Sequence, residues 1–327
     1  MLSTFEIPLT QLNSQLNEIS DFIDSIRSTK ISRSTVSYNA VIISLYGCYE
    51  NYVNSLAEEL ISQISNNSSN YAEIPTNMII SNIHLSSDFL KSKQRYKNFN
   101  LKNEDVINNI YSGKMTNKLL LKHGGNLSIA VLSEYFKNLG IKDVVQQIKN
   151  NNKFCQYYSE IKTISIDNAK SYLHEPDIIF PYLGDLIFQR NTIAHSWKSD
   201  DKVDYSIIKD EWIKFIRIFC ECLYDAVVSF YSQWLVKCKK LFCPKGFKIY
   251  GSSVVGFFDV QSYCQDNNKT VIIVVNEKIH VCKILNVKTH ENYKVSMKIE
   301  GYSLKKEQSE KYSFYFDKTF LKKSTND

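Results

Sequence analysis

The chain lacks the features that mark secreted and membrane-embedded proteins. Its eight cysteines in 327 residues are too sparse for a disulfide framework, and none form a Cys-x2-Cys pair. The N-terminal residues lack the basic start and apolar core of a signal peptide. The most apolar stretch, residues 218–236, carries Glu221 and Asp225, which favours a core helix over a membrane span. These absences predict a soluble, cytoplasmic protein without membrane association.

A metal-binding pattern is also lacking. Four cysteines lie near one another in sequence, at Cys220, Cys222, Cys238 and Cys243, but their spacing does not match a zinc knuckle. We therefore expect buried or free thiols, no metal site and no other cofactor.

Arginine is missing from the last quarter of the chain, whereas lysine is abundant there. From Lys245 onwards there are 14 lysines against nine acidic residues, and the whole chain has a net charge of +6. Nearly all of the positive excess therefore belongs to this region. A mildly basic appendage on a nearly neutral body favours a polyanionic partner.

The periodicity of apolar residues predicts a mainly α protein with a small β appendage. With 43% hydrophobic residues, the chain can bury a large core. Helices are predicted around the 3,4-spaced run Leu9, Leu12, Leu16, Ile19, Ile23 and Ile26, over residues 34–62, and over residues 207–237 with Ser206 as a candidate N-cap. They form an antiparallel helical bundle over residues 1–242, with an insertion at about 66–175.

Beyond Pro244 the pattern changes to short strands separated by turn residues. We expect five strands, at 247–260, 270–275, 279–287, 294–299 and 312–316. Such strands predict a small antiparallel barrel or sandwich over residues 243–327, whose role the sequence leaves open.

The chain brings a guanidinium, a carboxamide and an imidazole together in one run of six residues, Arg190-Asn191-Thr192-Ile193-Ala194-His195. Pro181 and the apolar residues that follow it predict a helix that ends in this motif. At about 100° per residue, Asn191 and His195 lie on one face, whereas Arg190 lies roughly 140° from His195. The length of the arginine allows it to reach round the helix.

These side chains suit the cleavage of RNA without a metal ion. The ribose 2'-OH would attack the adjacent phosphorus while His195 moves protons. Arg190 would stabilise the charge that grows on the phosphoryl oxygens, with Asn191 as an orienting amide. An Arg-x4-His string also occurs by chance, so the alternative is a helix end without a catalytic role.

A second cluster of cations interleaves with aromatic residues at 91–99. Single-stranded nucleic acid suits such a segment, because cations follow phosphates and rings stack on bases. The alternative is a solvated helix end. The candidate RNA-binding residues are Lys91, Lys93, Arg95, Tyr96 and Lys97.

The run from Arg190 to His195, together with its helix, resembles the Arg-Asn-x-Ile-Ala-His signature of HEPN-domain ribonucleases, particularly the RiboL-PSP-like group. Two other places look similar: the pattern Leu45-Tyr46-x3-Glu50, and a short helix opened by Asn126-Leu127 and closed by Leu139-Gly140-Ile141. The resemblance covers roughly residues 5–240. The long insertion and the β region are departures from the basic HEPN unit.

The resemblance implies an antiparallel bundle that forms a homodimer, with two Arg-x4-His motifs in one cleft. It implies that Arg190 and His195 are the catalytic pair, with Asn191 beside them. Glu50, which by itself is either a surface carboxylate or an inward partner for a cation, becomes a candidate to orient or neutralise Arg190 or His195.

The resemblance also implies a biological setting and leaves two alternatives. Members of this superfamily act as toxins and as effectors of antiviral defence, often beside an antitoxin or a sensing partner protein. Other HEPN domains only dimerise or bind nucleotide or RNA. In a third interpretation the chain is an adaptor for a partner, with Arg190 paired to Glu50 and His195 favoured only by the helix dipole.

Overall fold

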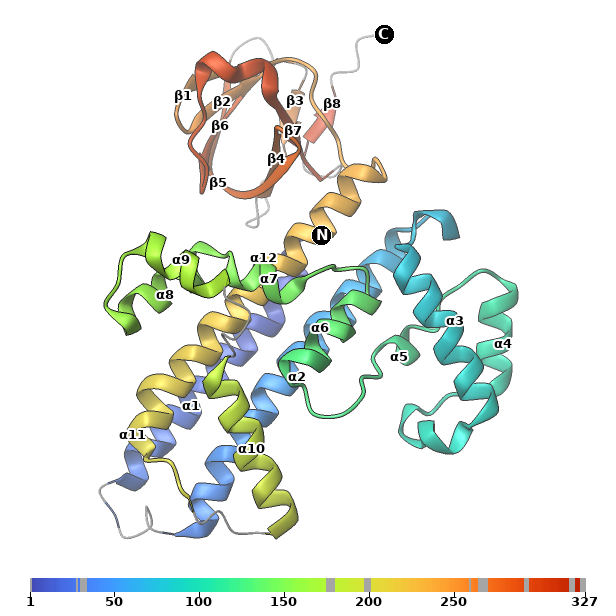
Figure 1. Ribbon diagram of the computed structural model, residues 1–327. Helices are drawn as coiled ribbons and strands as arrows, with labels where there is room; N and C mark the ends of the chain where they lie inside the picture. Colours follow the sequence, from blue (N-terminus) through green and yellow to red (C-terminus); the bar gives the residue numbers. More distant parts are fainter. Residues whose placement is uncertain are drawn as a thin grey trace. The chain divides into compact units, whose positions relative to one another are not determined.

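The computed structural model describes residues 2–27, 29, 34–174, 180–196, 201–258, 260–263, 270–290, 294–317 and 321–323. The chain divides into two compact units: a helical unit, Thr4–Val227, and a C-terminal unit that contains Val228–Asp327 and the first three residues. The predicted mainly α fold with a small antiparallel β appendage is confirmed (Figure 1). The predicted boundary at residue 242 stays a prediction.

The helical unit is built on long helices joined by several shorter ones. Its α-helices are α1 (Glu6–Arg27), α2 (Thr35–Asn67), α3 (Thr76–Lys91), α4 (Asn103–Tyr111), α5 (Asn117–Leu120), α6 (Ile129–Asn138), α7 (Val144–Lys149), α8 (Asn152–Lys162), α9 (Ile166–His174), α10 (Pro181–Ser196), α11 (Tyr205–Ile207) and the first part of α12 (Lys214–Lys237). Shorter turns are η1 (Ser3–Phe5), η3 (Tyr71–Glu73), η4 (Lys93–Phe99) and the π-helical η5 (Ile208–Ile213).

Helices α1 and α2 form where the apolar pattern predicts them. The predicted stripe of α1 is buried from Leu12 to Ile26, with Leu9 half-buried. The side chain of Ser34 caps α2 by accepting the N–H of Val36. This helix continues five residues beyond its predicted end, because Ile64 extends the buried face by another turn.

The predicted helix over 207–237 differs from the structure at its start. Asp204, not Ser206, is the N-cap, because its carboxylate accepts the N–H of Ser206 at 2.7 Å. A π-helical segment, η5, then separates the short α11 from α12. Trp212 within the π-helical turn and Phe215 and Phe219 after it are nevertheless all buried.

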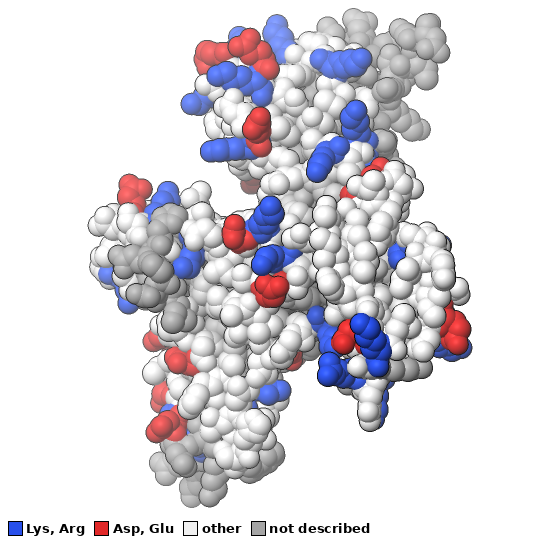
Figure 2. Space-filling view, turned by 45° about the vertical axis from the view of Figure 1, so that its right-hand side comes forward, with Lys and Arg blue, Asp and Glu red and all other residues white. Residues whose placement is uncertain are grey.

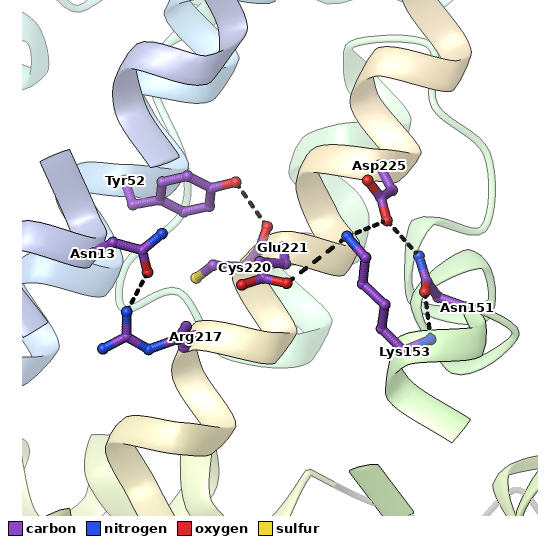
Figure 3. A network of polar contacts seen from close by, with 8 residues as sticks. All are labelled: Asn13, Tyr52, Asn151, Lys153, Arg217, Cys220, Glu221 and Asp225. Carbon is purple, nitrogen blue, oxygen red and sulfur yellow. Dashed lines mark hydrogen bonds and ion pairs between the residues drawn. The ribbon is translucent and has the colours of Figure 1, made fainter. Parts of the chain in front are cut away.

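Polar contacts fix α12 against three other helices (Figure 3). Arg217 donates to Asn13 of α1 at 2.7 Å, and Tyr52 of α2 donates to the carbonyl of Cys220 at 2.7 Å. On the other side, Lys153 of α8 lies 3.1 Å from the carboxylate of Asp225, which also accepts from Asn151 at 2.9 Å. These bonds set the rotation of α12, so that its apolar residues face the bundle core.

An aromatic cluster joins α2, α8, α12 and the start of α10. Phe219 lies 6.1 Å from Tyr49 of α2 and 5.3 Å from Phe180, as measured between ring centroids. Phe154 of α8 and Phe215 also contact the Phe180 ring, at 5.3 and 6.2 Å. Since Phe180 directly precedes α10, this cluster fixes the point at which α10 begins.

The C-terminal unit is a curled antiparallel sheet of six strands in the order β1-β2-β6-β5-β4-β7. The strands are β1 (Phe247–Gly251), β2 (Val254–Phe257), β4 (Thr270–Val275), β5 (Lys278–His290), β6 (Lys294–Glu300) and β7 (Tyr312–Tyr315), and a separate pair is formed by β3 (Val260–Tyr263) and β8 (Leu321–Lys323). The rings of Phe247 on β1 and Phe314 on β7 lie 4.8 Å apart, so the two edges of the sheet approach each other.

The predicted first strand, 247–260, is wrong as a single element. It is a hairpin of β1 and β2 that turns at Ser252 and Ser253, and residue 260 begins β3. Strand β8 was not predicted. Seven of the eight cysteines are described, and none of these seven is in a disulfide bond.

Candidate active site

Helix α10 carries the Arg190 to His195 motif and is held by contacts near its start and along its inner face. Near its start, the hydroxyl of Tyr182 donates to Glu211 of η5 at 2.5 Å. Leu183, Leu186 and Ile193 are buried along its inner face. The motif therefore lies on a firmly packed helix, as the sequence predicts, and occupies its last two turns.

Arg190 and Asn191 contact each other and two residues from elsewhere in the helical unit. The carboxamide oxygen of Asn191 accepts from Arg190 Nη1 at 3.3 Å and from Asn126 Nδ2 at 2.7 Å. The guanidinium carbon of Arg190 lies 5.3 Å from the ring centroid of Tyr46, which allows a cation–π contact. The arginine thus has an amide on one side and an aromatic ring on the other.

Tyr46 links this arginine to Glu50 and to the loop before α6. Its hydroxyl donates to Glu50 Oε1 at 3.2 Å and accepts from the buried N–H of Leu127 at 3.1 Å. Burial is the main cause that raises the pKa of Tyr46 to about 12, so the hydroxyl keeps its proton at neutral pH. Glu50 is therefore connected to Arg190 through the Tyr46 side chain.

Removing the Tyr46 hydroxyl is expected to destabilise the helical unit by about 1–3 kcal/mol, because the buried N–H of Leu127 loses its acceptor. The Tyr46→Phe variant keeps the ring beneath Arg190. Urea denaturation followed by circular dichroism measures the change. Tyr111→Phe, at a ring that is 87% exposed, is the matched control and should leave the midpoint unchanged. Equal midpoints for both variants would contradict the bonding role of Tyr46.

His195 lies in the last turn of α10 and is exposed. Gly184, Phe188, Asn191 and His195 are spaced by 4, 3 and 4 residues, so they form one stripe along the outer side of the helix. Phe188 within this stripe is 64% exposed. The imidazole is thus accessible to a substrate, and the exposed ring of Phe188 lies about two turns earlier on the same stripe.

The structure separates the second predicted cluster into buried and exposed members. Tyr96 is 2% exposed, and its hydroxyl donates to Asp88 at 2.6 Å. The stacking role predicted for Tyr96 does not fit this burial, because a base needs a free ring face. Lys91, Arg95 and Lys97 are exposed, and the side chain of Lys93 lies outside the described residues. Binding of RNA by these cations stays a prediction.

Comparison with protein families gives a match to RiboL-PSP-HEPN over residues 10–229. The chain belongs to the RiboL-PSP-HEPN family. HEPN domains are generally ribonucleases or nucleotide-binding domains. The matched range contains the motif helix, Tyr46 with Glu50, and the loop that carries Asn126.

Other comparisons add little to the RiboL-PSP-HEPN match. The comparison with curated proteins gives no match. Among solved structures, the crystal structure of the S-layer protein rSbsC(31-844) shows 12% sequence identity and a TM-score of 0.19. The structure of surface layer protein SbsC, domains 1-6, shows 10% sequence identity and a TM-score of 0.16. The two matches cover 99% and 92% of this chain, respectively, but only 44% and 41% of the S-layer chains. Scores this low do not indicate a shared fold.

Asn126 and Tyr46 are the residues of this HEPN site that sequence reasoning missed. Both lie in patterns that carry the family resemblance, Asn126-Leu127 and Leu45-Tyr46-x3-Glu50. Their side chains meet the motif only in three dimensions. In the part of the chain that the structure describes, no three His, Cys, Asp or Glu side chains gather as a metal site, and no helix is long and apolar enough to cross a bilayer.

Proposed function

We propose that this RiboL-PSP-HEPN protein is a metal-independent endoribonuclease whose catalytic residues are Arg190 and His195. The observation that carries the proposal is the pair itself: an arginine held by Asn191 and Tyr46, and an accessible histidine within the next turn and a half of the same helix. The family match supports a ribonuclease or nucleotide-binding role.

The proposed reaction is transesterification within the RNA backbone. The ribose 2'-oxygen attacks the adjacent phosphorus, the bond from phosphorus to the 5'-oxygen breaks, and a 2',3'-cyclic phosphate and a 5'-hydroxyl remain. His195 moves the proton of the 2'-OH or the proton needed by the leaving oxygen. Arg190 stabilises the charge on the non-bridging oxygens.

Asn191, Tyr46 and Glu50 act on the arginine and not on the substrate. The Asn191 oxygen and the Tyr46 ring limit the directions that the guanidinium can take. Glu50 accepts a hydrogen bond from the Tyr46 hydroxyl and thereby fixes the ring. An arginine whose position is set before the substrate binds loses less entropy in the transition state.

A second copy of the chain completes the proposed site. His195 and Phe188 lie on the same exposed stripe of α10, so a copy that packs on Phe188 also approaches His195. Two facing copies would bring two motifs together and exclude water from the imidazoles. We therefore propose a homodimer that uses this stripe.

Replacing Phe188 with glutamate is expected to convert the dimer into a monomer, because a carboxylate would have to be buried at the centre of the interface. The far-ultraviolet circular dichroism should stay the same, since Phe188 is exposed in the single chain. Light scattering after size-exclusion chromatography measures the mass. Ile83→Glu, at a residue that is 53% exposed on α3, is the control and should stay dimeric. A dimeric Phe188→Glu protein would place the interface elsewhere.

The enzymatic proposal is tested by incubating the purified protein with total RNA and with tRNA in EDTA. Cleavage with 2',3'-cyclic phosphate ends is the expected result, and DNA should remain intact because it lacks the 2'-OH. A His195→Ala preparation made in the same way controls for contaminating nucleases. Fragments with linear 3'-phosphate ends from the outset, or cleavage that EDTA stops, would contradict the proposed chemistry.

The cellular role that we propose is that of a toxin or an antiviral-defence effector, restrained or triggered by a partner protein. A ribonuclease of this kind slows growth when it is expressed without that partner. Expression of the wild type beside the His195→Ala variant therefore separates an enzyme from a binding module or an adaptor. Equal growth of both, with no cleavage of RNA by the purified wild type, would favour the non-catalytic alternatives.

A further inference from the structure

The C-terminal unit has an open groove of about 600 Å³ on the outer face of its curled sheet. Strands β1, β2, β5 and β6 form the floor, and Phe258 follows β2 directly. Of the described residues that line the groove, none is acidic, and the side chains that supply rings, charge and hydrogen-bonding groups are Tyr250, Phe258, Asn286, Lys288, Ser296 and Lys298.

The strand register explains why these side chains share one face. Lys298 of β6 pairs with Val254 of β2 and with Asn286 of β5, which forms one row across the sheet. Ser296 pairs with Gly256 and Lys288, which forms the next outward row. The row between them, Val255, Met297 and Val287, belongs to the buried core. The alternation is the ordinary two-residue period of a strand, and it gives the groove a fixed set of polar groups.

Two aromatic side chains that line the groove are exposed and do not pack in the core. Tyr250 is 57% exposed and Phe258 is 40% exposed. The Tyr250 ring lies over Gly256, so closely that a β-carbon at this glycine would come within 2.7 Å of the ring. Lys248, which pairs with Gly256, places its Nζ 5.7 Å from the centroid of Tyr250. Because Gly256 has no side chain, the Tyr250 ring can lie against the strand at this position.

Charge and aromatic rings together define the ligand chemistry. Lys288 and Lys298 line the groove, Lys248 lies beside the Tyr250 ring, and the region from Lys245 onwards carries 14 lysines against nine acidic residues. Lysine side chains, in blue, are more widespread than acidic ones, in red, on the C-terminal unit in Figure 2. A lipid surface or an acidic protein would satisfy the lysines but would make no specific use of two exposed ring faces. Single-stranded nucleic acid uses the rings and the lysines together, because its bases stack on aromatic rings while its phosphates lie near the cations.

We propose that this groove binds single-stranded RNA, with bases stacked on Tyr250 and Phe258 and phosphates near Lys288 and Lys298. The choice of RNA over single-stranded DNA rests on the proposed ribonuclease function. The C-terminal unit is then the substrate-binding part of the protein. This assignment gives a role to the basic strand region, which lies outside the RiboL-PSP-HEPN match.

The proposal is tested on the full-length His195→Ala protein, so that binding is measured without cleavage. Fluorescence anisotropy with a short labelled oligouridylate reports the Kd. Each of Tyr250→Ala and Phe258→Ala is expected to weaken binding by about 5- to 100-fold, as the loss of one stacked base predicts. Replacing Lys288 and Lys298 with alanine is expected to lower the slope of log Kd against log salt by roughly 1.4, or about 0.7 per phosphate contact.

Matched variants distinguish a groove from general attraction to a basic protein. Lys306→Ala with Lys311→Ala removes the same charge at exposed positions that do not line the groove, and it should leave the Kd within about twofold. Full affinity after loss of both rings, or equal weakening by the two lysine pairs, would overturn the proposal. Binding that depends on the rings, together with a wild type that cleaves no RNA, would support the groove and reject the ribonuclease.

Discussion

Replacing His195 with alanine is expected to slow RNA cleavage by roughly 100- to 10,000-fold, the usual contribution of a general acid or base. The loss arises because no other imidazole lies in the motif, and the exposed position of His195 gives the substrate direct access to the lost group. Single-turnover cleavage of a labelled RNA measures the effect on the chemical step. The far-ultraviolet circular dichroism and the dimer mass should stay as in the wild type.

The cleavage rate of an Arg190 variant shows whether the effect of His195→Ala belongs to the Arg190 to His195 motif. Arg190→Ala is expected to slow RNA cleavage by about 100- to 1,000-fold, because the charge on the phosphoryl oxygens is no longer stabilised. Because the two residues act in one transition state, the Arg190→Ala and His195→Ala double variant should cleave RNA only a little more slowly than the slower of the two single variants. Cleavage by His195→Ala at the wild-type rate would assign the chemistry to another part of the chain.

The second large effect is expected at Phe219, where truncation to alanine should reduce the free energy of unfolding by about 3–5 kcal/mol. The ring is 1% exposed and contacts rings of α2, of α12 and of the residue before α10. A domain is typically stable by only about 5–15 kcal/mol, so this loss is a large share of the total. Since Phe180 fixes the start of α10, the variant should also lose RNA cleavage well below its unfolding temperature.

An exposed phenylalanine serves as the matched control for Phe219. Phe22 on α1 is 42% exposed, and its replacement by alanine should change the free energy of unfolding by less than about 1 kcal/mol. Chemical denaturation of both variants, followed by circular dichroism, gives the comparison. Similar losses for the two would contradict the view that the aromatic cluster is the main support of α10.

Local patterns predicted the helices of the site because they depend on neighbours three and four residues away. The buried stripe of α1 and the inner face of α10 follow directly from such spacing. The break between β1 and β2 within residues 247–260 was missed, because Ser252 and Ser253 interrupt the run without a turn-forming pair such as Asn-Gly. The cap at Asp204 was missed because Ser206 is an equally good capping residue in sequence terms.

Contacts between distant residues were beyond what spacing could predict. Asn126 and Asn191 are 65 residues apart, yet their side chains are hydrogen-bonded. The aromatic and basic run at 91–99 shows the opposite problem, since the same composition suits a stacking surface and a packed turn. The Tyr96 ring is buried, and its hydroxyl donates to Asp88, a residue outside the run that its composition could not indicate.

The hydrogen bonds from Asn126 and Leu127 have a consequence for attempts to reduce this protein to a minimal catalytic fragment. Both residues come from the segment that separates α2 from α10 in sequence, and one meets Asn191 while the other meets Tyr46. A shortened protein that kept only α1, α2, α10 and α12 would retain every residue of the Arg-x4-His motif. It would nevertheless lose the hydrogen bonds that hold Asn191 and Tyr46 around Arg190, so a fragment meant to keep the arrangement of this motif must include the segment.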